Sequence, residues 1–258
     1  MNKKINIVGT GNVASHIALA LNNCGFAINS IVGRNRQKVE SLAQKIGAKP
    51  LSKASSDTEN EIFIVSVSDS AIPEVISSIS SNNTVLHTSG SVSIEVLSRF
   101  KNHGVFYPLY SFVADQNVRW SEVPFLFEWN NSISESVLIS IAHQCDFNFH
   151  EVDSLARSRY HLSAVFSHNF VNFIIAASQE YIYQNSLDFK ILVPILKQLI
   201  DNANTHQDLH QLQTGPALRG NIDILEKHLS MLDDFPIYQD VYLQMTKWIE
   251  MFHNSLKI

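Results

Sequence analysis

The first 150 residues alternate between short apolar runs and longer amphipathic stretches. The short runs are rich in β-branched and aromatic residues and predict strands at 5–8, 28–32, 61–69, 84–90, 105–112, 124–129 and 147–152. Segments with helical spacing lie between most of them and predict helices at 13–22, 37–46, 72–79 and 134–145. Strands separated by helices of this length favour parallel pairing through right-handed crossovers. The pattern therefore predicts an α/β domain with a doubly wound parallel sheet of the Rossmann type.

Helical periodicity replaces this alternation from residue 153 to the end. It predicts helices at 155–184, 189–204, 221–232 and 237–254. We therefore expect two domains, a Rossmann domain over 1–152 and an all-helical domain over 153–258. On the first helix, apolar residues at helical spacing are predicted to be core residues, namely Leu162, Phe166, Phe170 and Ile174. No window is apolar for long enough to predict a membrane span.

The composition of the chain indicates which binding partners and which cellular location to expect. The 258 residues are 45% hydrophobic and 17% charged, with a net charge of −5, which is typical of a globular protein. Because the chain has no excess of basic residues that would attract a phosphate backbone, nucleic acid is not an expected partner. The chain has two cysteines, Cys24 and Cys145, without metal-ligand spacing. This usage favours a reducing, cytoplasmic location.

The first predicted strand runs into a glycine-rich turn. Gly9, Gly11 and Ala14 fit the pattern G-x-G-x-x-A between a strand and a helix. The first glycine permits a tight turn, the second lets a pyrophosphate approach the backbone, and the small third residue allows close packing. We expect this turn to bind a dinucleotide through Gly9, Thr10, Gly11, Asn12 and Val13. The alternative is a purely structural turn.

The end of the second predicted strand indicates which dinucleotide is bound. Sites that prefer NAD usually carry a carboxylate here, whereas this chain has Arg34 and Asn35. A guanidinium matches a 2′-phosphate, which a carboxylate would repel. We therefore expect NADP as the cofactor. The alternative is a solvated surface arginine.

Motifs across nearly the whole chain resemble one group of proteins. The stretches "GTGNVA" and "VGRN" resemble the NADP-binding domains of the 6-phosphogluconate dehydrogenase-like group, which includes pyrroline-5-carboxylate and ketopantoate reductases. Further motifs are similar to a bacterial family that pairs a Rossmann-like domain with a helical domain of unknown function: "HTSGS", "YPLYSF", "RYHLSAVFSHNF" and "TGPALRGN". The resemblance implies an NADP oxidoreductase and a homodimer. Tyr107 departs from the family pattern, where histidine usually stands, which puts a proton-transfer role at this position in question.

Further site residues are expected beyond the carboxyl ends of the strands, where ligands of open parallel sheets bind. Ser66, Val67 and Ser68 follow one strand and are expected beside the cofactor. His87 ends the next strand, where it would donate a proton or orient a substrate carbonyl. The alternative is a histidine that is hydrogen-bonded at a strand end. Tyr107 can protonate an alkoxide, although aromatic packing is the more common role.

The helical half offers three more candidates. Arg157, His161 and His168 recur on one face of the first predicted helix, where we expect His161, with the neighbouring Asn169, to contact substrate. A structural or dimer contact is the alternative. Arg219 lies in "TGPALRGN", predicted to be a loop, and would bind a substrate carboxylate unless it holds the loop. Metal chemistry is not expected, because Gln207 replaces the glutamate base in the zinc-like "HQDLH".

The combined hypothesis is an NADP-dependent oxidoreductase that transfers hydride between NADPH and a small carbonyl or imine. The cofactor carries out the hydride chemistry, and the protein supplies orientation and a proton donor. The competing hypothesis is a non-catalytic NADP-binding sensor or scaffold, because each catalytic candidate also has a structural explanation.

Overall fold

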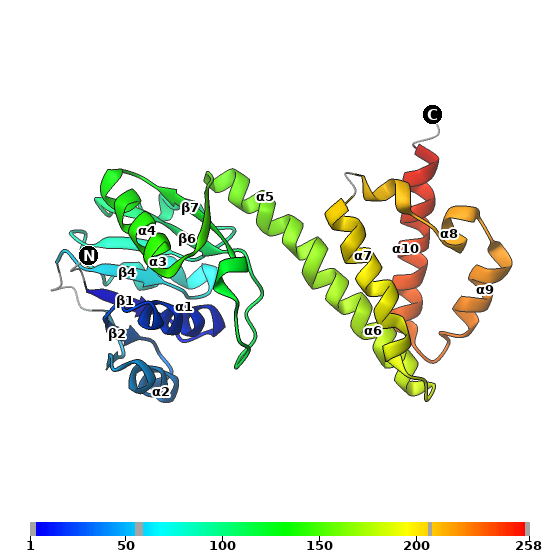
Figure 1. Cartoon of the computed structure of the whole chain (residues 1–258), viewed down its shortest axis with the longest axis horizontal. Coiled ribbons are helices and arrows are strands. Elements are labelled where there is room, and N and C mark those ends of the chain that lie inside the picture. Colours follow the sequence, from blue (N-terminus) through cyan, green and yellow to red (C-terminus); the bar gives the residue numbers. More distant parts are fainter. Residues whose placement is uncertain (1–3, 55–58, 206–207, 256–258) are drawn as a thin grey trace. The chain divides into compact units, whose positions relative to one another are not determined.

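The computed structural model describes residues 4–54, 59–205 and 208–255. The chain divides into two compact units, residues 1–169 and 170–258 (Figure 1). The change from strands to helices falls between Glu151 and Ser154, as the sequence predicts. The packing division lies later because the first turns of the following helix contact the sheet unit. The predicted domain boundary at residue 152 remains a prediction.

One sheet forms the centre of the first unit. The described residues form eight strands, and these are β1 (Ile5–Val8), β2 (Ile28–Val32), β3 (Lys49–Leu51), β4 (Ile62–Val65), β5 (Thr84–His87), β6 (Asn102–Pro108), β7 (Pro124–Trp129) and β8 (Asn148–Glu151). Their order is β3-β2-β1-β4-β5-β6-β7-β8. The chain leaves β1 toward one edge through β2 and β3 and crosses back to β4. The topological switch point of the fold therefore lies between β1 and β4.

The sheet is not wholly parallel. β6 and β7 pair antiparallel, whereas the other neighbours are parallel. The segment between them contains only a short 3-10 turn (Trp120–Glu122) and no crossover helix. An antiparallel neighbour needs no crossover, whereas a parallel one does. The prediction of a doubly wound Rossmann sheet is confirmed, with this one strand pair as the correction.

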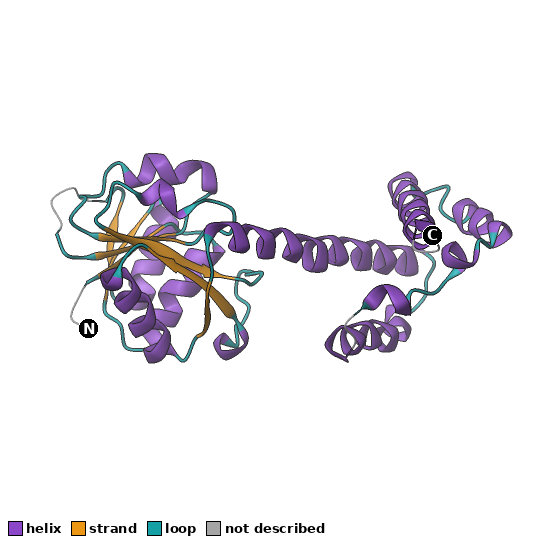
Figure 2. Cartoon of the chain, turned by 90° about the horizontal axis from the view of Figure 1, so that it is seen from above, coloured by secondary structure: helices purple, strands orange, loops and turns teal. Residues whose placement is uncertain are grey.

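Helices cover both faces of the sheet (Figure 2). One face packs against α1 (Asn12–Asn23), α2 (Arg36–Ile46) and α4 (Ser132–Cys145). The other face packs against α3 (Ile72–Ile76) and the 3-10 segment Ile94–Leu97. Strands such as β4, in which all four residues are buried, read as continuous apolar runs because both faces are covered.

A long helical stretch follows the sheet. α5 (Ser154–Ala164) begins at Asp153, whose carboxylate accepts a hydrogen bond from the Ala156 amide at 2.7 Å. A π-helical segment (Val165–Phe170) and α6 (Val171–Gln184) continue it. The sequence predicts one uninterrupted helix over 155–184. The π segment inserts an extra residue per turn and so changes the face that later side chains present.

The described residues of the second unit form helices and no strand. The α-helices among them are α6, α7 (Val193–Thr205), α8 (Pro216–Arg219), α9 (Ile222–Ser230) and α10 (Pro236–Ser255). Among its described residues, Ala217 is the one buried residue. The short α8 corrects the prediction of a loop over 214–221. No helix in the described part of the chain is long and apolar enough to cross a membrane.

Candidate functional site

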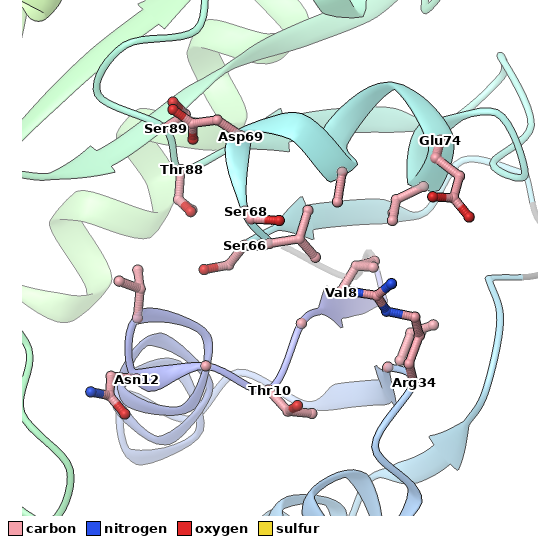
Figure 3. A pocket seen from close by; sticks show the side chains of 18 of the residues that line it. Val8, Thr10, Asn12, Arg34, Ser66, Ser68, Asp69, Glu74, Thr88 and Ser89 are labelled. Carbon is pink, nitrogen blue, oxygen red and sulfur yellow. The ribbon is translucent and has the colours of Figure 1, made fainter.

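A cavity of about 950 Å³ opens at the carboxyl ends of β1 and β4, at the switch point of the sheet. It runs from Arg34 and Glu74 at one end to Thr88 and Ser89 at the other (Figure 3). All ten residues predicted to contact the cofactor line it: Gly9, Thr10, Gly11, Asn12, Val13, Arg34, Asn35, Ser66, Val67 and Ser68. The structure thus brings together residues that lie up to 59 positions apart in the sequence.

The two glycines of the turn differ in what surrounds them. Gly9 has a φ of +126°, and a Cβ there would lie 1.9 Å from the carbonyl oxygen of Ser66. A Cβ at Gly11 would meet no protein atom within 4 Å. Gly9 is therefore required by the protein's own packing. Gly11 leaves open space at the start of α1, where free backbone N–H groups and the helix dipole favour an anion.

Two asparagine side chains that line the cavity also form hydrogen bonds to neighbouring segments. The Asn12 side-chain amide donates to the Phe112 carbonyl at 3.0 Å, which ties α1 to the segment after β6. The Asn35 side chain accepts from the Lys38 amide at 3.0 Å and so caps α2. Both residues still line the cavity. The sequence predicted the positions of these residues but not these structural bonds.

Tyr107 and His161 meet at the far end of the cavity. Tyr107 Oη lies 3.0 Å from His161 Nδ1, and both side chains line the cavity. A Cβ at Gly90 would come within 2.8 Å of both rings, so the glycine allows the pair to approach the end of β5. The sequence named each residue separately. Their contact joins β6 to α5 and could not be read from spacing.

The surroundings of Tyr107 keep its hydroxyl protonated. Burial raises the pKa of Tyr107 to about 12, and the negative charge of Asp69 acts in the same direction. Asp69 itself accepts a hydrogen bond from the Ser91 hydroxyl. At neutral pH Tyr107 is therefore a neutral O–H donor at the wall of the cavity.

His87 lies beneath this wall. It is fully buried, its Nδ1 accepts from the Ser89 amide at 3.1 Å, and it does not line the cavity. Burial, helped by the charge of Arg157, lowers the pKa of His87 to about 3. The ring is therefore neutral at physiological pH. These features favour the alternative weighed for it, a histidine hydrogen-bonded at a strand end.

Arg157 anchors the start of α5 to the sheet. Its fully buried guanidinium forms an ion pair with Glu128 of β7 and donates to the Val92 carbonyl at 2.6 Å. The Ser154 hydroxyl donates to the same Glu128 carboxylate at 2.8 Å and accepts from the Ile94 amide at 3.0 Å. This network fixes the turn of α5 that precedes His161. Arg157 was noted only as part of a polar stripe.

The remaining predicted residues lie elsewhere. Asn169 and His168 fall in the π segment, are exposed and do not line the cavity. Arg219 is the exposed last residue of α8 in the second unit. Their substrate roles remain predictions. Of the zinc-like spacing, His206 lies outside the described residues and His210 stacks on Phe252.

Family models match both parts of the chain. Residues 4–94 match the family described as NADP oxidoreductase coenzyme F420-dependent. Residues 123–249 match a domain of unknown function, DUF2520. The resemblance drawn from the motifs, to a Rossmann-like NADP oxidoreductase domain followed by a helical domain of unknown function, is confirmed. A comparison with curated proteins gives no match.

Solved structures extend the likeness to the full chain. A Bacteroides fragilis protein, provisionally described as an NADP oxidoreductase, is 28% identical with a TM-score of 0.85, covering 96% of this chain and 98% of that one. A reductive aminase from Aspergillus terreus, in complex with NADPH4, cyclohexanone and allyl amine, has a TM-score of 0.74 at 13% identity over 99% and 95%. A pyrroline-5-carboxylate reductase from Streptococcus pyogenes has a TM-score of 0.62 at 13% identity over 96% and 98%. The likeness to these two enzymes concerns the fold.

Proposed function

We propose that this chain, which joins an NADP oxidoreductase domain to a helical domain of unknown function, transfers hydride between NADPH and a small carbonyl or imine. The observation that carries the proposal is the cavity at the switch point. Its one end has the open glycine turn and a guanidinium, and its other end has a protonated tyrosine in contact with a histidine. The similar reductive aminase and pyrroline-5-carboxylate reductase support a carbonyl or imine as the substrate class.

The residues of the cavity fit an NADP molecule. The pyrophosphate would lie against Gly11 and the amino terminus of α1, and the 2′-phosphate beside Arg34. The nicotinamide end of the molecule would then lie toward Thr88 and Ser89, at the other end of the cavity (Figure 3). NADPH, when bound, supplies the hydride.

The protein would supply the proton. Tyr107 would donate its hydroxyl proton to the substrate oxygen or nitrogen. His161 Nδ1, which lies 3.0 Å from the tyrosine oxygen, would return a proton to it and take one up from solvent, so the tyrosine stays neutral. Burial, which raises the pKa of Tyr107 to about 12, makes a free tyrosinate unfavourable and so favours this coupled transfer.

Reversing the charge of Arg34 tests whether this residue binds the 2′-phosphate of NADP. We expect Arg34→Asp to weaken NADPH binding by about 100-fold, because a charge-assisted contact is replaced by repulsion, and to change NADH affinity by less than about threefold. Isothermal titration calorimetry measures both. Arg36→Asp is the matched control, because Arg36 pairs with Glu40 at 2.7 Å and does not line the cavity. Equal losses for both cofactors, or none, would contradict a 2′-phosphate at Arg34.

Removing the tyrosine hydroxyl tests the proton donor. We expect Tyr107→Phe and His161→Ala to lower turnover by about 100-fold or more while NADPH affinity stays within about twofold. NADPH oxidation is followed with cyclohexanone plus an amine, a cyclic imine and small ketones. Tyr110→Phe is the control, since Tyr110 is half exposed and does not line the cavity. Full activity of Tyr107→Phe would remove this residue from the mechanism.

The same assay separates the enzyme from the competing sensor or scaffold. A sensor binds NADPH tightly and oxidises it with no member of the panel. A polar cavity wall beyond the expected nicotinamide position, formed by Ser89, Tyr107 and His161, favours the enzyme.

We further propose that the protein is a homodimer that associates through its helical unit. Large apolar side chains of this unit are exposed, among them Ile191 (77%), Ile237 (68%) and Ile222 (65%). Unit 170–258 has one buried residue among those described, so it cannot be stabilised by a core of its own. A second copy would cover these faces, and sedimentation equilibrium would show twice the chain mass.

The location that we propose is the cytoplasm of a bacterium. The chain has two cysteines, Cys24 and Cys145, and both are free thiols. So few cysteines, without a disulfide, are typical of a protein from a reducing compartment.

A further inference from the structure

We infer that Lys53, which follows β3, completes the site for the adenosine 2′-phosphate together with Arg34 and thereby sets the preference for NADP over NAD. This inference rests on the proposed function and assigns a specificity-determining role to a residue that the sequence patterns did not single out.

The sheet register places the two basic residues just beyond the ends of adjacent strands. In the parallel pair of β2 and β3, Val32 lies opposite Leu51, and the Gly33 amide donates to the Leu51 carbonyl at 3.1 Å. Arg34 and Lys53 each come two residues beyond this matched pair. Because neighbouring strands are about 4.8 Å apart, the two residues leave the sheet at adjacent points of its carboxyl edge. Both line the cavity that contains the glycine turn.

Neither cation is neutralised within the described part of the chain. Four other basic residues there form ion pairs, namely Lys4 with Glu61, Arg36 with Glu40, Arg119 with Glu122 and Arg157 with Glu128. No ion pair of Arg34 or Lys53 is found among the same residues. Two like charges at adjacent strand ends repel one another, and an anion between them would relieve this repulsion.

The acidic groups of the cavity are placed on its other wall. Glu74 belongs to α3 and lies across the cavity from Arg34 (Figure 3). Asp69, which accepts a hydrogen bond from the Ser91 hydroxyl, lies toward the opposite end of the cavity. A dianionic group would therefore be drawn to the edge of β2 and β3 and away from α3. The pyrophosphate already has the glycine turn, so the remaining anion of NADP is the 2′-phosphate.

The two side chains would contribute differently. The planar guanidinium of Arg34 donates paired hydrogen bonds to two phosphate oxygens, and the ammonium of Lys53 acts as a mobile point charge on a third. Because Lys53 is exposed, solvent and salt screen its contribution. Its loss should therefore weaken binding less than the loss of Arg34.

Calorimetry on the full-length protein tests this with four probes: NADPH, NADH, 2′,5′-ADP and 5′-ADP. We expect Lys53→Ala to lower the affinity for NADPH and for 2′,5′-ADP by about fivefold to tenfold. The affinity for the two probes without a 2′-phosphate should change by less than about twofold. Lys53→Arg should retain most of the preference. Added salt should reduce the NADPH preference of the wild type more than that of Lys53→Ala.

Lys45→Ala is the matched control, because Lys45 is an exposed lysine of α2 that does not line this cavity. Equal losses on all four probes would place Lys53 at a part shared by both cofactors and overturn the inference. An unchanged NADPH preference would overturn it as well. Failure of the wild type to bind NADPH would instead contradict the proposed function, and the inference would fall with it.

Discussion

Replacing Arg157 with alanine should lower the free energy of unfolding by about 3–5 kcal/mol, the usual cost of leaving one member of a buried ion pair alone. The Arg157 side chain is 0% exposed, and its partner Glu128 is 16% exposed. The variant would leave the Glu128 carboxylate in a poorly solvated place and free the Val92 carbonyl. Chemical denaturation measures the loss.

Arg36→Ala provides the comparison for this result. Arg36 pairs with Glu40 on α2, but its side chain is 89% exposed, so solvent screens the pair and its loss should lower the stability far less than the loss of Arg157. A double variant, Arg157→Met with Glu128→Gln, should recover part of the stability because no lone charge remains. A loss below about 1 kcal/mol for Arg157→Ala would show that the pair does not hold α5.

The Arg157 network also matters for the site. His161 is one turn further along α5, and its position against Tyr107 depends on how α5 begins. We therefore attribute to Arg157 a positioning role that acts through His161. The sequence could not predict this role, because Glu128 and Arg157 are 29 positions apart and lie on a strand and a helix whose packing has no local signal.

Local patterns predicted most of the sheet unit. β1, β2 and β7 have the predicted bounds, because each is an apolar run closed by glycine, asparagine or a charged residue. β3 was missed because its three residues, Lys49–Leu51, are exposed and include a proline. A strand is recognised in a sequence by the apolar residues that it buries, and an exposed edge strand has no such residues.

The sequence predicted those parts of the candidate site whose residues follow one another closely in the chain. The glycine turn and Arg34 are read from a few consecutive residues, and the ten residues expected at the cofactor line one cavity. Lys53 and the contact of Tyr107 with His161 depend on strand register and on packing over 54 positions. Such contacts follow from the fold and not from spacing.

Apolar periodicity misled the prediction in the helical half. Leu162, Phe166, Phe170 and Ile174 have the spacing of core residues, yet they are 58%, 60%, 51% and 40% exposed in the single chain. Periodicity shows that a helix face is apolar but does not show whether the same chain covers it. The proposed homodimer would explain why these residues are apolar.

Substitution by alanine should lower the stability much more at Gly9 than at Gly11, although both glycines belong to the same turn. Gly9→Ala should cost about 3 kcal/mol or more of stability, because alanine is strained at a φ of +126° and its Cβ would overlap the Ser66 carbonyl. Gly11→Ala should cost less than about 1 kcal/mol, because Gly11 has a φ of −75° and open space around it. Thermal and urea denaturation measure both.

Although Gly11→Ala should leave the protein stable, it should lower the affinity for dinucleotides. The open space at Gly11 is where a pyrophosphate would approach the backbone, so a methyl group there should weaken both NADPH and NADH by about tenfold or more. The folded Gly11→Ala protein thus separates a ligand site from a structural turn, because nothing in the protein itself requires glycine at this position. If Gly11→Ala binds both nucleotides as tightly as the wild type, the turn is structural. The pyrophosphate must then bind elsewhere or not at all.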